Sequence, residues 1–514
     1  MRRRDLLLGA LAIPFGAALA QRLVDSGVMA DEAAPTEEGV PFDAWTVRQL
    51  ARSLAEKPYA PPEPNLPEWL AEINYDQFRG IRFAPDHAVW RAEQLPFQLQ
   101  FFHRGFYFRD RVDIHRVVDG KAYPIHYSPD LFTFEGVEKP NVNDLGFAGF
   151  RIHGPINRPD YFDEICVFLG ASYFRAVAKH QVYGLSARGL SIKTGNPQGE
   201  EVPVFRAFWV EQPAPDAATI VVHALLDSES AAAGFRFTIR PGDTTVFDVE
   251  ATLYPRVDIE EAGIATLTSM FFFDASDRIG VDDYRPAVHD SDGLLIWNGR
   301  GEQLWRPLAN PTSLQISQFT DANPRGFGLM QRKRDFAIYQ DLEARYERRP
   351  SAWVELIGDW GNGAAVLVEI PTNSEIHDNI VAFWRPRDPL RAKGEYPFTY
   401  RIHWCWDTPW PTELARIAET RIGQAWEDPS TRLFVIDVAG GKLGELPPEA
   451  KPRIEAWSNV GQLRNLVAQP NPETGGWRMS FELVPEDNPS VELRAQLILD
   501  DKPLSEVWVY RWTS

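Results

Sequence analysis

The sequence predicts an all-β protein with a large N-terminal antiparallel β-sandwich over residues 40–410 and a small C-terminal immunoglobulin-like β-sandwich over residues 411–514. Short apolar or alternating runs bounded by turn residues recur from about residue 75 onward, mostly at a spacing of about 10 to 16 residues. Long helical patterns are nearly absent, which argues against a parallel α/β sheet. The 514 residues exceed what one compact core holds, so two or more domains are expected.

Residues 1–30 are predicted to be an export signal. The first twenty of these residues contain three arginines, an apolar stretch from Leu6 to Leu19 and the small-residue ending Ala18-Leu19-Ala20. The apolar stretch is too short to span a membrane. An arginine pair before a polar residue and three leucines resembles a twin-arginine signal, and an ordinary Sec signal is the alternative. Cleavage after Ala20 or Ala30 would release the mature chain into a bacterial periplasm.

The first elements of the mature chain are predicted to be a helix and an extended wrap. Apolar residues recur at helical spacing over residues 42–54, and Asp43 is positioned to cap this helix. Five prolines between residues 58 and 67 then prevent regular structure.

Strand patterns account for most of the remaining sequence up to residue 407. Typical examples are FQLQFFHRGFYFRD at 97–110 and TTVFDVEATLYPRV at 244–257. WVELIGDWGNGAAVLVEIP is predicted to be a hairpin around Gly361-Asn362-Gly363. Residues 331–346 have helical spacing and mixed charge, which indicates a short surface helix or a lid. Residues 412–426 fit either a helix or a strand.

The predicted immunoglobulin-like domain is based on five strand-like runs within about 85 residues. They are RLFVIDVAGG, KPRIEAWSNVG, GWRMSFELVPED, SVELRAQLILDD and LSEVWVYRWTS.

Composition narrows the class of ligand. The net charge is -19, which argues against binding to a nucleic-acid backbone and fits a neutral or weakly charged ligand. The 17 tryptophans suit a large aromatic core and leave room for a sugar-stacking surface. Cys166 and Cys405 lie in apolar runs and are expected to be buried thiols, with a single disulfide as the alternative. No metal-ligand spacing is found, and no cofactor is expected.

Residues 282–306, DDYRPAVHDSDGLLIWNGRGEQLWR, combine acids, tryptophans and arginines in a glycine-punctuated segment. Carboxylates that move protons beside flat aromatic faces are what a sugar-cleaving site needs. Within this segment, Asp290 and Asp292 could form an acid pair. The alternative role of Asp292 is to form a turn before Gly293.

Four stretches together resemble one family. They are YRPAVHDSDGLLIWNGRGEQLWRPL, NPRGFGLMQRKRDFAIYQD, RPSAWVELIGDWGNGAAVLVEIPT and HDNIVAFWRP. They are similar to the periplasmic osmoregulated glucan biosynthesis proteins of Gram-negative bacteria, the OpgG/OpgD (MdoG/MdoD) family. The resemblance runs from about residue 42 to the C-terminus, and the twin-arginine-like signal resembles the OpgD branch more than the OpgG branch.

The resemblance implies a galactose mutarotase-like N-terminal sandwich and a substrate of β-1,2-linked glucan. OpgD-type members are similar to anomer-inverting endo-β-1,2-glucanases that use two aspartates. The matching positions make Asp378, in the HDNIVAFW motif, the general acid and Asp290, in VHDSDG, the general base. The membrane glucan glucosyltransferase is an implied partner.

Inverting chemistry explains why two different carboxyl groups are needed. One must be protonated to donate to the leaving oxygen, and the other must be ionised to activate water, with roughly 6.5–9.5 Å between them. Asp378 precedes a strongly apolar run, which suits a partly desolvated acid. The alternative for Asp378 is a strand-start cap. His289 and His377, which precede the two aspartates, are expected to be hydrogen-bonded structural residues.

Aromatic, basic and acidic residues near the two aspartates form the predicted substrate-binding set. The alternatives are core packing for the aromatic residues and ion pairs at sheet edges for the charged ones. Glu369 carries the same choice between lining the site and pairing with an arginine. The set is Tyr284, Asp292, Trp305, Arg306, Arg325, Trp353, Glu355 and Trp384.

Three functions remain open from the sequence. The first is a glycoside hydrolase that trims the glucan. The second is a non-catalytic glucan-binding or assembly factor acting beside the membrane glucosyltransferase. The third is a mutarotase-like or lyase enzyme on another sugar, which the lack of an evident His/Glu pair disfavours.

Overall fold

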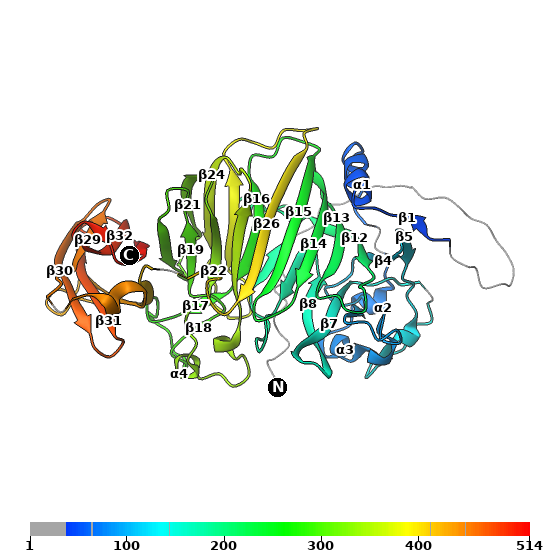
Figure 1. Cartoon of the computed structure of the whole chain (residues 1–514), viewed down its shortest axis with the longest axis horizontal. Coiled ribbons are helices and arrows are strands. Elements are labelled where there is room, and N and C mark those ends of the chain that lie inside the picture. The colour runs from blue at the N-terminus through cyan, green and yellow to red at the C-terminus, as the bar shows by residue number, and fades with distance from the viewer. Residues whose placement is uncertain (1–37, 63–64, 143, 412, 448) are drawn as a thin grey trace.

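The structure is a computed structural model that describes residues 38–62, 65–142, 144–411, 413–447 and 449–514. The predicted export signal therefore lies outside the described residues. Strands dominate and form two large sheets, a four-stranded sheet and two short pairs, which confirms the all-β prediction (Figure 1). None of the helices in the described part of the chain has the length and apolar character that crossing a membrane requires.

The first large sheet has sixteen strands. In order across the sheet, its strands are β1 (Val40–Pro41), β5 (Lys121–Pro124), β4 (Asp113–Val118), β12 (Val204–Glu211), β13 (Ile220–Asp227), β14 (Ala231–Arg240), β15 (Thr245–Pro255), β26 (Tyr396–Cys405), β23 (Ser351–Ile357), β22 (Gly326–Met330), β19 (Gly293–Trp297), β20 (Gln303–Pro307), β34 (Val507–Thr513), β32 (Ser490–Leu499) and β29 (Arg453–Ser458), with β33 (Lys502–Pro503) paired to β32.

The second large sheet has ten strands. Its order is β21 (Gln315–Ala322), β24 (Asn362–Glu369), β25 (Ile380–Pro386), β16 (Ala262–Ser269), β10 (Ser186–Arg188), β9 (Tyr173–Ala176), β8 (Tyr161–Leu169), β7 (Gly149–Arg158) and β3 (Gln98–Phe102), with β11 (Ser191–Ile192) paired to β16.

The short strand pairs and the helices surround these two sheets. The pairs are β2 (Ile81–Phe83) with β6 (Phe132–Phe134), and β17 (Phe271–Phe273) with β18 (Val288–His289). The helices are α1 (Thr46–Ala55), α2 (Glu68–Ala71), α3 (Tyr75–Arg79) and α4 (Phe336–Tyr339), and the 3-10 turns are η2 (Pro85–His87), η3 (Pro129–Leu131), η4 (Tyr346–Arg348) and η5 (Gly441–Glu445).

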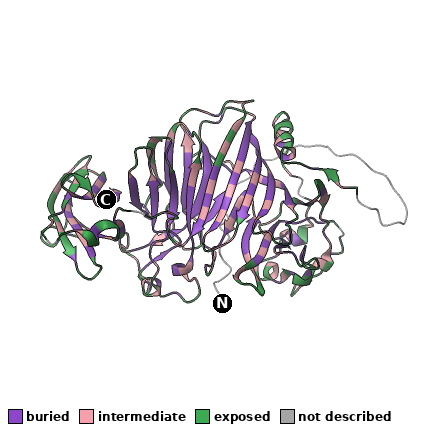
Figure 2. Cartoon of the chain, in the orientation of Figure 1, coloured by how far each residue is buried: buried purple, intermediate pink, exposed green. Residues whose placement is uncertain are grey.

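The two large sheets pack face to face over one aromatic core. Strand β15 alternates buried and half-buried residues over its first half, as period-2 geometry requires. Phe168 of the ten-stranded sheet contacts Phe208 and Phe237 of the sixteen-stranded sheet edge to face, with ring centroids 5.4 Å apart in both pairs. The central strands are mostly buried, with half-buried positions between the buried ones (Figure 2), and this sandwich contains the main core of the molecule.

Two strand pairings depart from the antiparallel prediction. Strand β4 pairs in parallel with β12, and β20 pairs in parallel with β34. The second pairing extends the sixteen-stranded sheet into the C-terminal region. There, β29, β32 and β34 pack against a four-stranded sheet of β27 (Arg416–Gln424), β28 (Arg432–Ala439), β31 (Gly476–Val484) and β30 (Gln462–Asn471).

We call residues 413–514 the C-terminal module. All five of its predicted strands are present, residues 412–426 contain the strand β27, and β30 is an additional strand. One hydrophobic cluster joins module residues such as Phe434 and Trp508 to Trp305 and Trp353 of the large sandwich. The domain boundary at residue 410 stays a prediction.

The predicted hairpin around Gly361-Asn362-Gly363 is wrong. Strand β23 pairs with β22 and β26, whereas β24 pairs with β21 and β25 in the other sheet. Gly358 and Gly361 have φ angles of 88° and 66°, and their segment carries the chain from one layer to the other. Glycine-rich turn signals indicate a change of direction, but they do not show which sheet receives the next strand.

The helix predictions have mixed outcomes. Helix α1 overlaps the predicted region and ends one residue beyond it, and Asp43 accepts hydrogen bonds from the backbone amides of Trp45 and Thr46, both at 2.9 Å. In the segment predicted as a surface helix or lid, only α4 and one residue of η4 are helical. The first part of that segment is buried, with Gln331 and Lys333 less than a tenth exposed, so it is not a surface helix.

Candidate active site

Two aspartates that are far apart in the sequence lie beside the same short stretch of chain. The backbone amide of Asp290 donates to the carbonyl of Met270 at 2.8 Å. The side chain of Asn379, next to Asp378, accepts from the backbone amide of Phe271 at 2.9 Å. Asp290 follows β18, and Asp378 lies in the loop two residues before β25. Pairing around Met270 and Phe271 therefore brings the two predicted catalytic residues together.

Asp290 is fully buried and held by an arginine. Its Oδ1 atom accepts a close, charge-assisted hydrogen bond from Nη1 of Arg349. Its Oδ2 atom has no hydrogen-bond partner among the described residues. Burial raises the pKa of Asp290, and Arg349 partly offsets this effect.

Arg349 is itself fixed from several sides. Its Nε donates to the carbonyl of Ala344 at 3.2 Å, and its guanidinium lies over the ring of Tyr346 at 4.4 Å from the centroid. Proline follows at position 350, which keeps Arg349 extended at the end of η4. The orientation of Asp290 therefore depends on a buried, well-supported cation.

Asp378 is half-buried, and its carboxylate makes no hydrogen bond or ion pair with the described residues. Burial raises its pKa, Arg175 opposes this rise, and the charge on Asp290 adds to it. The charge on Asp290 thus acts on the Asp378 carboxyl, which indicates that the two groups lie in one electrostatic environment. Asp378 is thus biased toward the protonated form while retaining contact with solvent.

Arg175 reaches the site because of the strand period. In β9 the half-buried residues Tyr173 and Arg175 alternate with the buried residues Phe174 and Ala176. Since successive side chains point to opposite faces, Arg175 lies on the outer face of the ten-stranded sheet, away from the aromatic core. On the neighbouring strand β10, Arg188 has its guanidinium 4.8 Å from the ring centroid of Tyr173.

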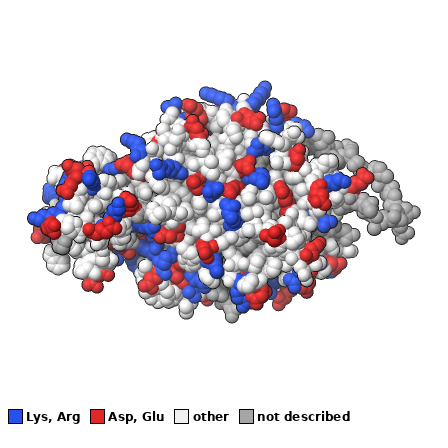
Figure 3. Space-filling view, in the orientation of Figure 1, with Lys and Arg blue, Asp and Glu red and all other residues white. Residues whose placement is uncertain are grey.

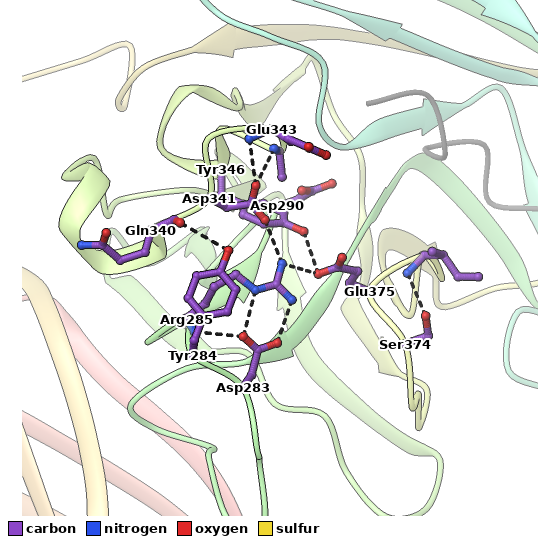
Figure 4. Close-up of polar contacts among 12 residues, drawn as sticks. Asp283, Tyr284, Arg285, Asp290, Gln340, Asp341, Glu343, Tyr346, Ser374 and Glu375 are labelled. Carbon is purple, nitrogen blue, oxygen red and sulfur yellow. Dashed lines mark hydrogen bonds and ion pairs between the residues drawn. The ribbon is translucent and has the colours of Figure 1, made fainter. Parts of the chain in front are cut away.

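A second cluster surrounds the buried residue Arg285 (Figure 4). Its guanidinium pairs with Asp283 at 2.8 Å, Asp341 at 2.9 Å and Glu375 at 2.7 Å. Glu375 lies on the same loop as Asp378, and it also accepts from the hydroxyl of Tyr346 at 3.3 Å. The loop that carries Asp378 is therefore tied to the segment around Arg349.

Of the predicted substrate-binding residues, Tyr284 lies in this cluster. It is highly exposed, and its hydroxyl is 3.5 Å from the carbonyl of Gln340 (Figure 4). An exposed aromatic ring beside a carboxylate cluster has a face available for a sugar ring.

The three predicted tryptophans lie in the core instead. Trp305 and Trp353 are packed in the cluster between the large sandwich and the C-terminal module, and Trp384 is packed in the main core. All three are at most 3% exposed, so none presents a free face to a ligand. Their role is therefore core packing, which was the alternative to substrate binding.

The predicted charged residues are also engaged elsewhere. Arg306 is buried and pairs with the buried Glu369 at 3.0 Å. Glu355 pairs with His403 at 3.0 Å. The Arg325 guanidinium is exposed and lies 4.6 Å from the ring centroid of Trp297.

Asp292 and the two histidines have structural partners. Asp292 is buried and accepts from the backbone amide of Arg332 at 3.0 Å. His289 bonds Gln331 through Nδ1 at 2.9 Å, and His377 bonds Thr372 through Nδ1 at 2.9 Å. The histidines are thus hydrogen-bonded, as expected.

Three residues of this region were not in the predicted site, namely Arg175, Arg349 and Glu375. The alternation in β9 carries a signal for Arg175, because an arginine between two buried positions must face outward. No local pattern distinguishes Arg349 from the other arginines in its basic segment. Both cysteines are buried free thiols, as expected.

Comparison with known proteins identifies the relatives of the chain. The family described as "Periplasmic glucan biosynthesis protein, MdoG" matches residues 42–512. Proteins named "Glucans biosynthesis protein G" from Bradyrhizobium diazoefficiens and Rhodopseudomonas palustris (strain BisA53) are each 57% identical over 514 residues, covering 100% of both chains. The protein of that name from Vibrio cholerae is 54% identical over 479 residues, which is 92% of this chain and 87% of the relative. These names favour the G branch over the D branch that the signal resembles.

Proposed function

Because the chain belongs to the family of periplasmic glucan biosynthesis proteins, we propose that it acts in the periplasm as an anomer-inverting endo-β-1,2-glucanase that trims the glucan backbone. The observation that carries the proposal is the pairing of a half-buried, unpartnered Asp378 with a buried, arginine-held Asp290 in one electrostatic environment. The family supports a role in glucan biosynthesis, and the hydrolytic step is our inference.

In this mechanism Asp378 is the general acid. Its raised pKa keeps a proton available, and its contact with solvent lets it reach the glycosidic oxygen. The proton passes to the leaving oxygen as the glycosidic bond breaks. Arg175 is positioned to stabilise the carboxylate that remains on Asp378.

Asp290 is the general base. It takes the proton of the attacking water, directly or through an intervening hydroxyl or water, as the new C–O bond forms on the opposite face of the sugar. Its free Oδ2 atom offers a lone pair for that proton, whereas Oδ1 is held by Arg349. The ion pair fixes the carboxylate and opposes the rise in its pKa that burial causes, which favours the ionised form that a base requires.

The surface charge fits a neutral glucan. Basic and acidic side chains are interspersed over the face in Figure 3, without a broad field of one sign. Such a surface neither attracts nor repels an uncharged chain, so recognition depends on local contacts. Tyr284 is the aromatic residue best placed to stack on a glucose ring.

A non-catalytic glucan-binding or assembly factor is the second candidate. The relatives are named for biosynthesis, and such a factor would work beside the membrane glucosyltransferase. The fully buried Asp290, locked to Arg349, favours this candidate, because a carboxylate without direct solvent contact must move its proton through a relay.

One experiment separates the two candidates. Purified mature protein is incubated with linear β-1,2-glucan, while chain length and the anomer of the new reducing end are followed. We expect shortening with inversion, abolished by Asp378→Asn and Asp290→Asn. Asp388→Asn is the matched control, because Asp388 is an exposed aspartate. Tight binding without shortening, with Asp378→Asn equal to wild type, would leave the assembly factor as the correct function.

A further inference from the structure

Four consecutive residues after β22 connect the candidate active site to the C-terminal module. They are Gln331, Arg332, Lys333 and Arg334, and we call them the junction segment. The two outer residues, Gln331 and Arg334, contact the active-site side, and the two inner residues, Arg332 and Lys333, contact the module.

The active-site contacts involve the immediate neighbours of Asp290 and the backbone of Arg349. The Gln331 side chain bonds His289 twice, at Nδ1 and at the carbonyl, both at 2.9 Å. The guanidinium of Arg334 donates to the carbonyl of Arg349 at 2.5 Å. The junction segment thus holds the residue before Asp290 and the backbone of Arg349.

The module contacts are two ion pairs. Arg332 makes a bidentate pair with Glu506, with both N–O distances 2.7 Å, and donates to the carbonyl of Ile417 at 3.0 Å. Lys333 pairs with Glu419 of β27 at 2.6 Å and closely with Asp274 of the large sandwich. Glu506 and Lys333 are buried.

Because they are largely buried, the ion pairs of Arg332 and Lys333 fix the position of the junction segment relative to the module. A buried charge that loses its partner is strongly unfavourable, so Arg332 and Lys333 cannot move away from the module without a large penalty. Lys333 and His289 hold the pKa of the buried Asp274 below its usual value, against the effect of burial. Asp274 also contacts His289 at 3.5 Å, so the network returns to the residue before Asp290.

We propose that the C-terminal module positions the catalytic base, with Glu506 and Glu419 as positioning residues that act through Arg332 and Lys333. This inference rests on the proposed hydrolytic function. Geometry at the base matters because a misplacement of about 1 Å costs on the order of 100-fold in rate. The module therefore takes part in catalysis without touching the substrate.

The test compares Glu419→Gln, Glu506→Gln and the double variant with a matched control. The control is Glu302→Gln, because Glu302 pairs with Arg494 of β32 at 2.6 Å and so also links the module to the large sandwich, away from the junction segment. We expect the test variants to lose roughly 10-fold or more in kcat with KM within about twofold, and the control to stay within about twofold in both. Equal kcat values for test and control variants, or a loss confined to KM, would overturn the proposal.

Amide hydrogen exchange separates failure of this inference from failure of the proposed function. If the wild-type protein shortens no glucan, the hydrolytic proposal fails, and exchange in peptides covering residues 286–292 and 345–351 still reports on positioning. We expect faster exchange there in both test variants than in Glu302→Gln. Unchanged exchange would refute the positioning role. Glu419 is partly exposed, so Glu419→Gln carries the test if Glu506→Gln fails to fold.

Discussion

Replacing Arg349 with methionine tests whether its buried ion pair stabilises the ionised form of Asp290, the proposed general base. Methionine retains an unbranched apolar stem but lacks the guanidinium and therefore the charge that holds Asp290. Asp290 is then a buried carboxylate without a cation, and removing one partner of such a pair typically costs about 3–5 kcal/mol. We expect that loss of stability at pH 8.

The loss of stability in Arg349→Met is expected to depend on pH, because it arises from the charge on Asp290. Without Arg349, the folded-state pKa of Asp290 rises further above the unfolded value of about 3.9. The cost is absent below the unfolded pKa and grows with pH until the folded pKa is passed. The stability deficit of Arg349→Met is therefore expected to be smaller at pH 5 than at pH 8, by about 1 kcal/mol, since one pKa unit corresponds to about 1.4 kcal/mol.

Urea unfolding followed by tryptophan fluorescence measures the deficit at both pH values. The double variant Arg349→Met/Asp290→Asn removes the buried charge and should recover part of the stability that Arg349→Met loses. Arg325→Met, an exposed arginine, serves as the control, with an expected change within about 0.5 kcal/mol. A deficit that is equal at pH 5 and pH 8 would refute the reasoning.

Three further predictions follow from the same structure. Arg306→Met leaves the buried Glu369 unpaired and should cost about 3–5 kcal/mol in urea unfolding, and an unchanged midpoint would contradict this. Trp353→Ala should cost about 3–5 kcal/mol while leaving KM for β-1,2-glucan unchanged, because the ring is in the core. Glucanase activity should fall as rising pH deprotonates Asp378, above its ordinary range, and Asp388→Asn should leave this pH profile unaltered.

Periodicity and turn residues predicted many of the strands, although β30 was not among them. The alternation in β15 and the five runs of the C-terminal module correspond to observed strands because buried faces impose period 2 on the sequence. The failed hairpin shows the limit of this reasoning. A residue pattern records that a strand is buried, but the identity of its neighbour depends on contacts made elsewhere in the chain.

The candidate site was predictable only in part, for the same physical reason. The motifs VHDSDG and HDNIVAFW predict Asp290 and Asp378 as the catalytic pair, and the structure places both beside Met270 and Phe271. Trp305 and Trp353 were predicted to bind substrate because they are among the aromatic residues nearest Asp290 or Asp378 in sequence, yet they pack against the C-terminal module. Arg349 was missed because one of several arginines becomes special only when folding places it against a buried carboxylate.

The parallel pairing of β20 with β34 has a consequence for how the protein can be divided. A chain that ended before the C-terminal module would leave backbone amide and carbonyl groups of β20 unpaired. It would also expose Trp305 and Trp353, which pack against the module. Open edges and bare apolar surface favour self-association. The large sandwich and the C-terminal module should therefore unfold in one cooperative transition. Neither is expected to be stable when it is fused to another protein without the other.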